Sequence, residues 1–386
     1  MDNLGKVLFD LSATQSSNES PVHGGGEYAK YVFKAAMKYK ARLICFYLND
    51  RELDDEIYTL CSEEGIELLP VSDKKEITKV MARVDIVAFY SALPYDFSGI
   101  DLHSKRFIGT VHGLRGVEFP TDKFEYIYRI GNLNKLKSFV NRYIKSKSKR
   151  RELAKQSFSK LFEKDNFEII TDSMHSKYSF ISFFPHLKVN QISVYRCPYE
   201  FDTYFNKQSK PRGYFLLVSS NRWIKNNFRA ILALDELFSE QNIEKKVIVL
   251  GTNGVDFLKY IKNRDKFIFK DYVSELELNS HFSEAFAFIY PTLNEGYGYP
   301  PIKAMEYQTP VIASAITSVT EVCEDAALYF NPLSISELKT RILTLLNQPD
   351  IKERLVSNGD KVVAKLRCSN ESQLSDIVEH IFKSEI

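Results

Sequence analysis

The 386-residue chain has few of the features that mark secreted, membrane-spanning or nucleic-acid-binding proteins. Its five cysteines show no paired spacing, which argues against a disulfide framework or a zinc cage and favours a reducing compartment. No apolar run approaches the roughly 20 residues of a membrane span, and the first run, "VLFDL", is too short for a signal peptide. The net charge of +2 gives no reason to expect nucleic acid as a partner. We therefore expect a cytoplasmic protein, either soluble or peripheral at the inner face of the cytoplasmic membrane.

The chain does contain a regular alternation of short β-type runs and helical stretches. Apolar residues recur at helical spacing in segments such as "EYAKYVFKAAMKY", and the β-type runs lie between such segments. These runs occupy residues 6–11, 41–48, 84–90, 106–112, 167–171, 214–220, 246–251, 266–272, 285–291, 310–314 and 327–330. The pattern predicts an α/β protein with two Rossmann-like, doubly wound parallel-sheet domains facing each other across a cleft.

The periodicity lapses over residues 197–213, where Pro198, Pro211 and Gly213 interrupt the chain. We read this stretch as a linker, which gives an N-terminal domain over residues 1–200 and a C-terminal domain over residues 201–368. A last helix is expected over residues 369–386, with Ser369 or Asn370 as its cap.

Residues 133–165 break the alternation, because this stretch is long, helical in composition and strongly basic. Its clustered cations are Lys145, Lys147, Lys149, Arg150 and Arg151. Its apolar face consists of Leu136, Phe139, Val140, Tyr143 and Ile144. We interpret the stretch as a helical insertion in the N-terminal domain that is either a solvated surface or a contact with anionic lipid or a charged acceptor.

The stretch "NEGYGYPPIKAME", residues 294–306, connects an apolar strand to a helix. Pro300 and Pro301 suit the first turn of a helix, where a missing N–H costs little. The last free amides before that turn belong to Gly296, Tyr297, Gly298 and Tyr299. Such a loop is either a structural turn or a phosphate cradle with the positive end of the helix dipole behind it. The glycines at 24–26 (Gly24, Gly25 and Gly26) offer a second, weaker place where phosphate or acceptor could approach the backbone.

Residues 290–338, which begin "YPTLNEGYGYPPIKAMEYQTPVIAS", resemble the carboxy-terminal signature of the family 4 retaining glycosyltransferases, enzymes of the GT-B fold. Weaker similarity follows in the family's order through "GGGEYAKYVF", "TVHGLRGVEFP", "ITDSMHSKYS", "YFLLVSSNRWIKN" and "DYVSELEL". The resemblance implies a nucleotide-sugar donor held mainly by the C-terminal domain. It also implies a glycan or lipid-linked glycan acceptor approached from the N-terminal domain.

The resemblance also assigns roles to single residues. Glu295 would contact sugar hydroxyls of the donor, and amides near Gly298 and Tyr299 would meet its diphosphate. Lys225 and Arg222 would neutralise the diphosphate, although two solvent-exposed cations in a loop are an alternative reading. His112, at the tip of an N-terminal strand, would face the donor sugar, although many histidines at strand ends are structural.

Lys303 departs from the family pattern, because members usually carry there a second glutamate that accepts hydrogen bonds from the ribose hydroxyls. A lysine ammonium can only donate, and a cation in the first turn of a helix is disfavoured unless an anion lies nearby. Candidate anions are Glu306, three residues further along the helix, and either Glu295 or the donor diphosphate. We hypothesise that this protein holds ribose differently; a deoxyribose donor and a lost nucleotide site are the alternatives.

The sequence and the resemblance thus favour transfer of a sugar from a nucleotide diphosphate donor to a hydroxyl of a growing glycan, with retention at the anomeric carbon. The expected process is the synthesis of bacterial surface polysaccharide. No Asp-x-Asp motif closes an apolar strand, so we expect no metal and no further cofactor. The alternative is a catalytically silent GT-B protein that serves as a nucleotide- or glycan-binding partner subunit.

Overall fold

The computed structural model describes residues 5–15, 24–144, 146–164, 166–202 and 213–383, and they form two compact units. Unit 1 comprises residues up to 114, 153–198 and those from 369 onward, whereas unit 2 comprises residues 115–152 and 199–368. The boundary near 198 lies in the linker read from the sequence. The division differs from the expected one in residues 115–152, which pack with unit 2 and not with the N-terminal domain.

Unit 1 is built on a seven-stranded parallel sheet with the order β3-β2-β1-β4-β5-β6-β7. Its strands are β1 (Lys6–Asp10), β2 (Leu43–Leu48), β3 (Glu67–Val71), β4 (Ile86–Ser91), β5 (Arg106–Thr110), β6 (Phe167–Thr171) and β7 (Ile192–Val194). Its helices are α1 (Gly24–Ala36), α2 (Asp55–Glu63), α3 (Lys74–Met81), α7 (Met174–Phe183) and most of α6 (Lys147–Phe162). Buried apolar residues of the central strands, such as Leu8, Phe89 and Ile108, form the core between the helical layers.

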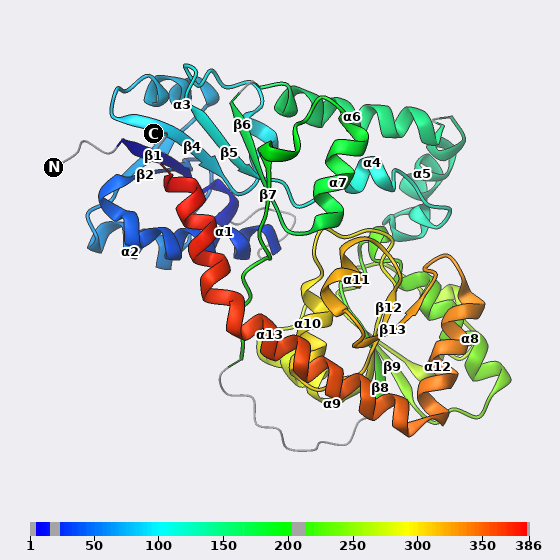
Figure 1. Cartoon of the computed structure of the whole chain (residues 1–386). Helices are drawn as coiled ribbons and strands as arrows, with labels where there is room; N and C mark the ends of the chain where they lie inside the picture. Colours follow the sequence, from blue (N-terminus) through cyan, green and yellow to red (C-terminus); the bar gives the residue numbers. More distant parts are fainter. Residues whose placement is uncertain (1–4, 16–23, 145, 165, 203–212, 384–386) are drawn as a thin grey trace. The chain divides into compact units, whose positions relative to one another are not determined.

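Unit 2 repeats this plan with a six-stranded parallel sheet in the order β10-β9-β8-β11-β12-β13. Its strands are β8 (Tyr214–Leu217), β9 (Lys246–Leu250), β10 (Phe267–Lys270), β11 (Ala285–Tyr290), β12 (Val311–Ser314) and β13 (Ala327–Phe330). Its helices are α4 (Arg115–Glu118), α5 (Asn132–Ile144), α8 (Asn227–Glu240), α9 (Glu275–Glu284), α10 (Tyr299–Glu306), α11 (Thr317–Cys323) and α12 (Ile335–Asn347). Helices α8 and α12 lie side by side over one face of this sheet, and α9 and α10 lie over the other (Figure 1).

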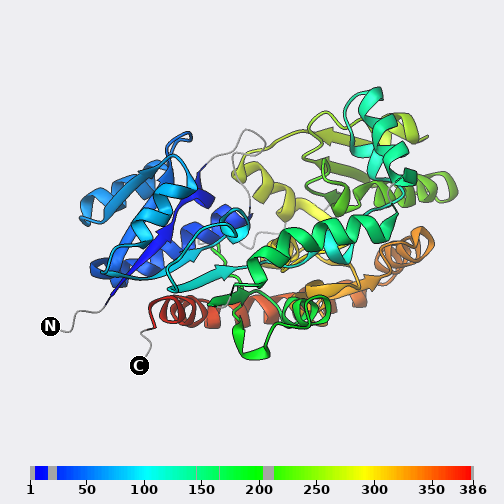
Figure 2. The same cartoon turned by 90° about the horizontal axis from the view of Figure 1, so that it is seen from above.

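The last helix is longer than the sequence suggested. We expected a separate helix starting at Ser369, but α13 runs unbroken from Pro349 to Phe382. Buried apolar residues continue through its whole length, from Leu355 to Ile381, so Ser369 and Asn370 fall inside the helix and do not cap a new one. Its end is fixed in unit 1, where Arg106 donates to the carbonyl oxygens of Lys383 at 2.6 Å and His380 at 3.2 Å. Both views show the end of α13 near β1 (Figure 1 and Figure 2).

The 115–152 segment comes from the N-terminal half of the sequence but is anchored in the core of unit 2. Arg229 of α8 donates two hydrogen bonds to the Asp122 carboxylate, at 3.1 and 2.7 Å, and both side chains are buried. The Tyr128 hydroxyl accepts from the Phe228 amide at 2.8 Å, and Ile127 joins the same apolar core. Among the described residues, no helix is long and apolar enough to cross a bilayer.

Candidate functional site

The strand order of unit 2 reverses between β8 and β11, and the loops after these two strands carry the predicted donor-site residues. In doubly wound sheets, ligands bind at such a switch point, outside the carboxyl ends of the strands. The loop after β8 leads through Arg222 into a short 3-10 helix that ends at Lys225. The loop after β11 carries Glu295. The topology therefore brings together residues that lie 70 positions apart in the chain.

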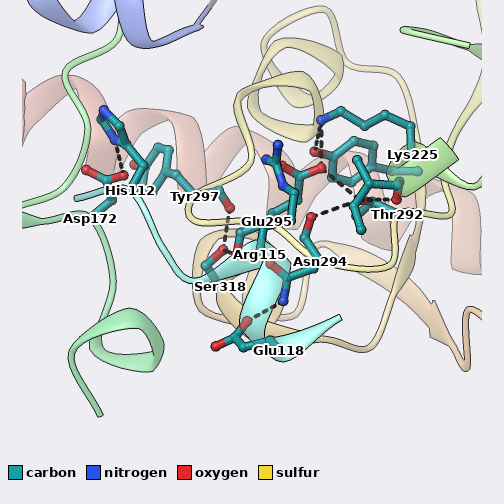
Figure 3. Close-up of polar contacts among 12 residues, drawn as sticks. His112, Arg115, Glu118, Asp172, Lys225, Thr292, Asn294, Glu295, Tyr297 and Ser318 are labelled. Carbon is teal, nitrogen blue, oxygen red and sulfur yellow. Dashed lines mark hydrogen bonds and ion pairs between the residues drawn. The ribbon is translucent and has the colours of Figure 1, made fainter. Parts of the chain in front are cut away.

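Lys225 and Glu295 form a buried ion pair at the centre of this site (Figure 3). Lys225 Nζ lies 2.6 Å from Glu295 Oε1, which also accepts a hydrogen bond from the Thr292 hydroxyl at 2.7 Å. Burial by itself raises the pKa of the Glu295 carboxyl, but the charges of Lys225 and Arg115 outweigh it and lower that pKa to about 2. Glu295 is therefore a fixed anion at neutral pH.

Two arginines add positive charge around this pair. Arg115 Nη2 lies 3.3 Å from Glu295 Oε2, and Arg222 stands immediately before the 3-10 helix that carries Lys225. Burial is the largest effect on the pKa of Lys225 and lowers it; the charges of Arg222 and Arg115 act in the same direction, whereas Glu295 opposes them. Three cations therefore surround one carboxylate, an arrangement that suits a bound anion.

The glycine-bearing loop leads into α10 as the sequence predicted. Gly298 has φ of 126°, a conformation that L side chains rarely adopt, and it directly precedes the first residue of the helix, Tyr299. The buried Ser318 hydroxyl contacts the carbonyl oxygens of Glu295 at 3.2 Å and Tyr297 at 2.8 Å, and so ties the loop to α11. The loop, including Gly296, is thus held at the positive end of the α10 dipole.

Lys303 pairs with a residue that the sequence analysis did not consider. Its Nζ lies 3.2 Å from Glu275 Oε1 at the start of α9. Neither anticipated carboxylate is used: Glu306 instead accepts from the Tyr199 hydroxyl and the Asp202 amide, both at 2.7 Å, and Glu295 pairs with Lys225. A contact of Lys303 with the donor diphosphate stays a prediction. The sequence could not identify Glu275, because it lies 28 positions away and meets Lys303 only through the packing of α9 against α10.

His112 lies in unit 1, two residues beyond the end of β5. Its Nδ1 lies 2.6 Å from Asp172 Oδ2, and the Tyr28 ring contacts its imidazole edge-on at 4.9 Å between centroids. Nε2 of His112 and the buried Oδ1 of Asp172 have no hydrogen-bond partner among the described residues. With Cys197 they form a group of potential ligand atoms within 4.8 Å of one another that could hold a metal ion. The expectation of metal-independent chemistry therefore stays a prediction.

The glycines at 24–26 open a helix of unit 1. Gly24, Gly25 and Gly26 are the first three residues of α1, and Gly26 is buried. The first turn of α1 therefore begins with three residues that have no side chain. Tyr28, whose ring contacts His112, follows two residues after Gly26. The role of these glycines in binding phosphate or acceptor stays a prediction.

Several residues of the site had no clear signal in the sequence. Arg115, Thr292, Asn294 and Asp172 lie inside the segments that carry the family resemblance, but the resemblance gave none of them a role. Asn294 donates a hydrogen bond to Glu118 of the 115–152 segment. Their position directly after apolar strands was the one available hint, since that edge of a parallel sheet gathers ligand-binding side chains.

The basic stretch divides into two helices, and its cations do not all face solvent. Arg150 Nη1 lies 3.1 Å from Glu125 Oε2, and Arg151 Nε donates to the Val117 carbonyl at 2.9 Å. Lys147 and Lys149 are exposed. Lys145 lies outside the described residues, as does the side chain of Tyr143. Four residues of the predicted apolar face of α5 are exposed, namely Leu136, Phe139, Val140 and Ile144, as is the neighbouring Leu133.

Comparison with known proteins adds an independent line of observation. Residues 200–362 match the family model described as glycosyl transferases group 1. The chain is 30% identical over 175 residues to an O-antigen chain mannosyltransferase, RfbU, of Salmonella typhimurium; this match covers 44% of the chain and 48% of RfbU. The chain thus spans about half the length of this curated relative. The resemblance to glycosyltransferases inferred from the motifs is confirmed over residues 200–362.

Solved structures match nearly the whole chain. Sucrose-phosphate synthase from Thermosynechococcus elongatus has a TM-score of 0.70 at 12% identity, over 99% of this chain and 100% of that one. HepE from Anabaena, solved in complex with UDP-glucose, has a TM-score of 0.64 at 12% identity, over 98% of this chain and 100% of that one. At these identities the likeness concerns the fold, and it confirms the expected GT-B architecture of two Rossmann-like parts.

Proposed function

We propose that this protein is a glycosyltransferase that moves a sugar from a nucleoside diphosphate sugar to a hydroxyl of a glycan, because residues 200–362 match the model of the glycosyl transferases group 1. The observation that carries the proposal is the buried Lys225–Glu295 pair beside the amides that open α10. A lysine, an arginine and a helix N-terminus next to an ionised carboxylate suit a ligand that combines a diphosphate with a hydroxyl-rich sugar.

The cations are the groups that we assign to catalysis of bond cleavage. When the donor's bond to its anomeric carbon breaks, negative charge builds on the leaving phosphate oxygen. Lys225 and Arg222, fixed by the fold, would stabilise this charge more strongly in the transition state than in the ground state. The amides of Gly298 and Tyr299, at the start of α10, would bind the same diphosphate.

Glu295 is proposed to accept hydrogen bonds from hydroxyls of the donor sugar. Its low pKa keeps it ionised, and an ionised carboxylate is an acceptor at both oxygens. We assign His112 to the sugar as well, because its Nε2 is buried without a partner among the described residues. Asp172 orients the ring through Nδ1.

The finer features of the reaction are proposed from the family resemblance. We propose assignment to family 4, retention at the anomeric carbon, proton transfer from the acceptor to the leaving phosphate, and independence of metal ions. The name of the Salmonella relative supports a role in bacterial surface polysaccharide synthesis and makes mannose the first donor sugar to test. We place the protein in the cytoplasm, where nucleotide sugars are made available to such enzymes.

Calorimetric titration without added metal tests the donor site directly. We expect one of UDP, GDP and thymidine diphosphate to bind with micromolar affinity, and Lys225→Ala to abolish this binding. Lys246→Ala is the matched control, because Lys246 is an exposed lysine at the far end of β9 and should bind as the unchanged protein does. Failure of all three nucleotides to bind would instead favour a catalytically silent partner subunit.

We further propose that α5 contacts an anionic lipid surface. Its apolar residues are unusually exposed for a soluble helix, with Leu133 at 74%, Leu136 at 59% and Ile144 at 71%. The exposed cations Lys137, Lys147 and Lys149 lie on or near this helix. An apolar face bordered by lysines matches an interface of apolar acyl chains and negative headgroups.

Liposome flotation tests this contact with single substitutions on α5. Leu133→Ser and Ile144→Ser should each reduce binding to vesicles that contain phosphatidylglycerol, without changing binding to neutral vesicles. Leu276→Ser is the control, because Leu276 is 84% exposed on α9 of the same unit. Equal flotation of all three variants would exclude α5 as the anchor. Arg150 and Arg151 are unsuitable targets, since both make internal contacts.

A further inference from the structure

Arg115 is a cation of the donor site to which the family resemblance gave no role, and it comes from the N-terminal half of the sequence. We propose that Arg115 is a third diphosphate-binding residue, delivered to the site by the 115–152 segment. This inference rests on the proposed function, because it concerns the same donor site. It adds a recognition element that separates nucleoside diphosphates from monophosphates.

The anchoring of the 115–152 segment fixes Arg115 relative to the donor loop. Asp122 and Arg229 make a paired, buried contact, and the Tyr128 hydroxyl accepts from the backbone of α8. A buried pair with two parallel hydrogen bonds holds its geometry well. Closer to Arg115, Asn294 in the donor loop donates a hydrogen bond to Glu118 of the same short helix. Arg115 therefore belongs to unit 2, the unit that carries the donor loop, although it comes from the N-terminal half of the sequence.

The contacts of Arg115 leave most of its hydrogen-bonding capacity unused. A guanidinium has five N–H donors, and the Arg115 side chain contacts Glu295 through Nη2 alone, at 3.3 Å. The side chain is 44% exposed, so its other donors remain accessible. An arginine fork matches the geometry of phosphate oxygens. A structural arginine that served only to hold Glu295 would be expected to make a shorter, two-point contact.

The charge of the cluster also argues for an anion. Lys225 already neutralises Glu295 at 2.6 Å, so Arg115 is not needed to balance this carboxylate. Placing Arg115 and Arg222 near the buried Lys225 instead adds repulsion, which is seen in their contribution to the lowered pKa of that lysine. A diphosphate group would relieve this repulsion, and a monophosphate would relieve less of it.

Titration of Arg115→Gln with nucleoside di- and monophosphates tests the inference. The nucleotide whose diphosphate binds the unchanged protein is used in both forms. We expect roughly tenfold weaker binding of the diphosphate, as for a lost hydrogen bond between charged groups that is partly exposed to solvent. Binding of the monophosphate should change less than about twofold, which is within the range of a remote surface substitution. Arg129→Gln is the control, because Arg129 lies in the same segment, is 49% exposed and pairs with Glu125 away from the donor loop.

A double-mutant cycle separates direct contact from an effect through Glu295. If Arg115 binds the diphosphate, Arg115→Gln should weaken binding by a similar factor in the Glu295→Gln background. If the loss disappears in that background, Arg115 acts only by holding Glu295 and the inference is overturned. Equal affinity of Arg115→Gln and the unchanged protein also overturns it but leaves the proposed function intact. Failure of the unchanged protein to bind any nucleoside diphosphate would contradict the proposed function itself.

Discussion

Two buried carboxyl groups, Asp10 in unit 1 and Glu295 in unit 2, occupy comparable places and have opposite electrostatics. Each lies at or just beyond the carboxyl end of a central strand of its sheet. Asp10 receives neutral donors, the Ser91 hydroxyl at 2.6 Å and the Ser12 amide at 2.8 Å, and burial raises its pKa to about 6. Glu295 contacts two cations, Lys225 and Arg115, and its pKa falls to about 2.

The difference shows that neutral donors do not offset the cost of burying a negative charge in this fold, whereas direct cations do. Asp10 is thus suited to exist in both protonation states near pH 6. Glu295 is suited to remain charged while a ligand exchanges around it. This contrast supports placing the anion-binding site in unit 2 and defines experiments that alter one carboxyl without the other.

Lys225→Met should have the largest effect on stability and on turnover, because it removes the nearest cation from Glu295. Separating a buried pair in this way costs about 3–5 kcal/mol, and loss of a transition-state charge contact lowers turnover by about 10²–10³. In the unchanged protein the folded pKa of Glu295 lies below its unfolded value. Its stabilising contribution is therefore present above about pH 4.5 and disappears only as pH falls toward 2.

In Lys225→Met the Glu295 pKa should rise, so that Glu295 behaves more like Asp10. Urea unfolding between pH 4 and 8 should then depend on pH more steeply than in the unchanged protein, where Asp10 already contributes a dependence in this range. Lys246→Met serves as the control. An identical pH profile for Lys225→Met and the unchanged protein would show that Lys225 does not set the Glu295 pKa.

Asp122→Ala should weaken the attachment of the 115–152 segment to unit 2. The substitution leaves the Arg229 guanidinium buried beside an empty position, which costs about 3–5 kcal/mol. The paired substitution Asp122→Leu with Arg229→Met removes both charges and should recover much of this loss. Thermal unfolding measures both variants. If the double variant is as unstable as Asp122→Ala, the buried charge of Arg229 is not the cause.

Asp10→Asn should remove a pH dependence of stability that is specific to unit 1. The folded pKa of Asp10, about 6, lies above its unfolded value of 3.8, so the folded state holds the proton more tightly. The contribution of this group to stability is complete below about pH 4 and is lost as pH rises through 6, by on the order of 3 kcal/mol. Asp50→Asn, at an exposed position, should leave the profile unchanged. A slope between pH 4 and 7 that persists in Asp10→Asn would assign the effect to other groups.

The sequence predicted the parallel sheets and the turn before α10 because these depend on local patterns, whereas Lys225 and Glu295 were indicated by the family resemblance. Strands have continuous apolar runs, and the glycine at 298 and the prolines at 300 and 301 mark the turn before α10. The path of residues 115–152 was not predictable, since Asp122 and Arg229 are 107 positions apart and neither belongs to a motif. Arg115 was missed because it meets Glu295 across 180 positions of the chain. The pKa difference between Asp10 and Glu295 also depends on partners that only the folded chain brings together.

Breaking the ion pair between Lys303 and Glu275 should have the smallest effect on stability. The Glu275 side chain is 79% exposed, and exposed ion pairs contribute roughly 0–1 kcal/mol, so the free energy of unfolding of Lys303→Gln should be close to that of the unchanged protein.

The informative change is Lys303→Glu, which restores the carboxylate that related enzymes carry but places it beside Glu275. If ribose is held differently here, this variant should bind the nucleoside diphosphate no more tightly than the unchanged protein, since the new carboxylate repels both Glu275 and the diphosphate. Many-fold tighter binding with undiminished turnover would make an adaptive role for Lys303 untenable. Calorimetry with the ribose and deoxyribose forms of one nucleotide gives the sharpest comparison, because only the ribose form offers the second hydroxyl to a carboxylate.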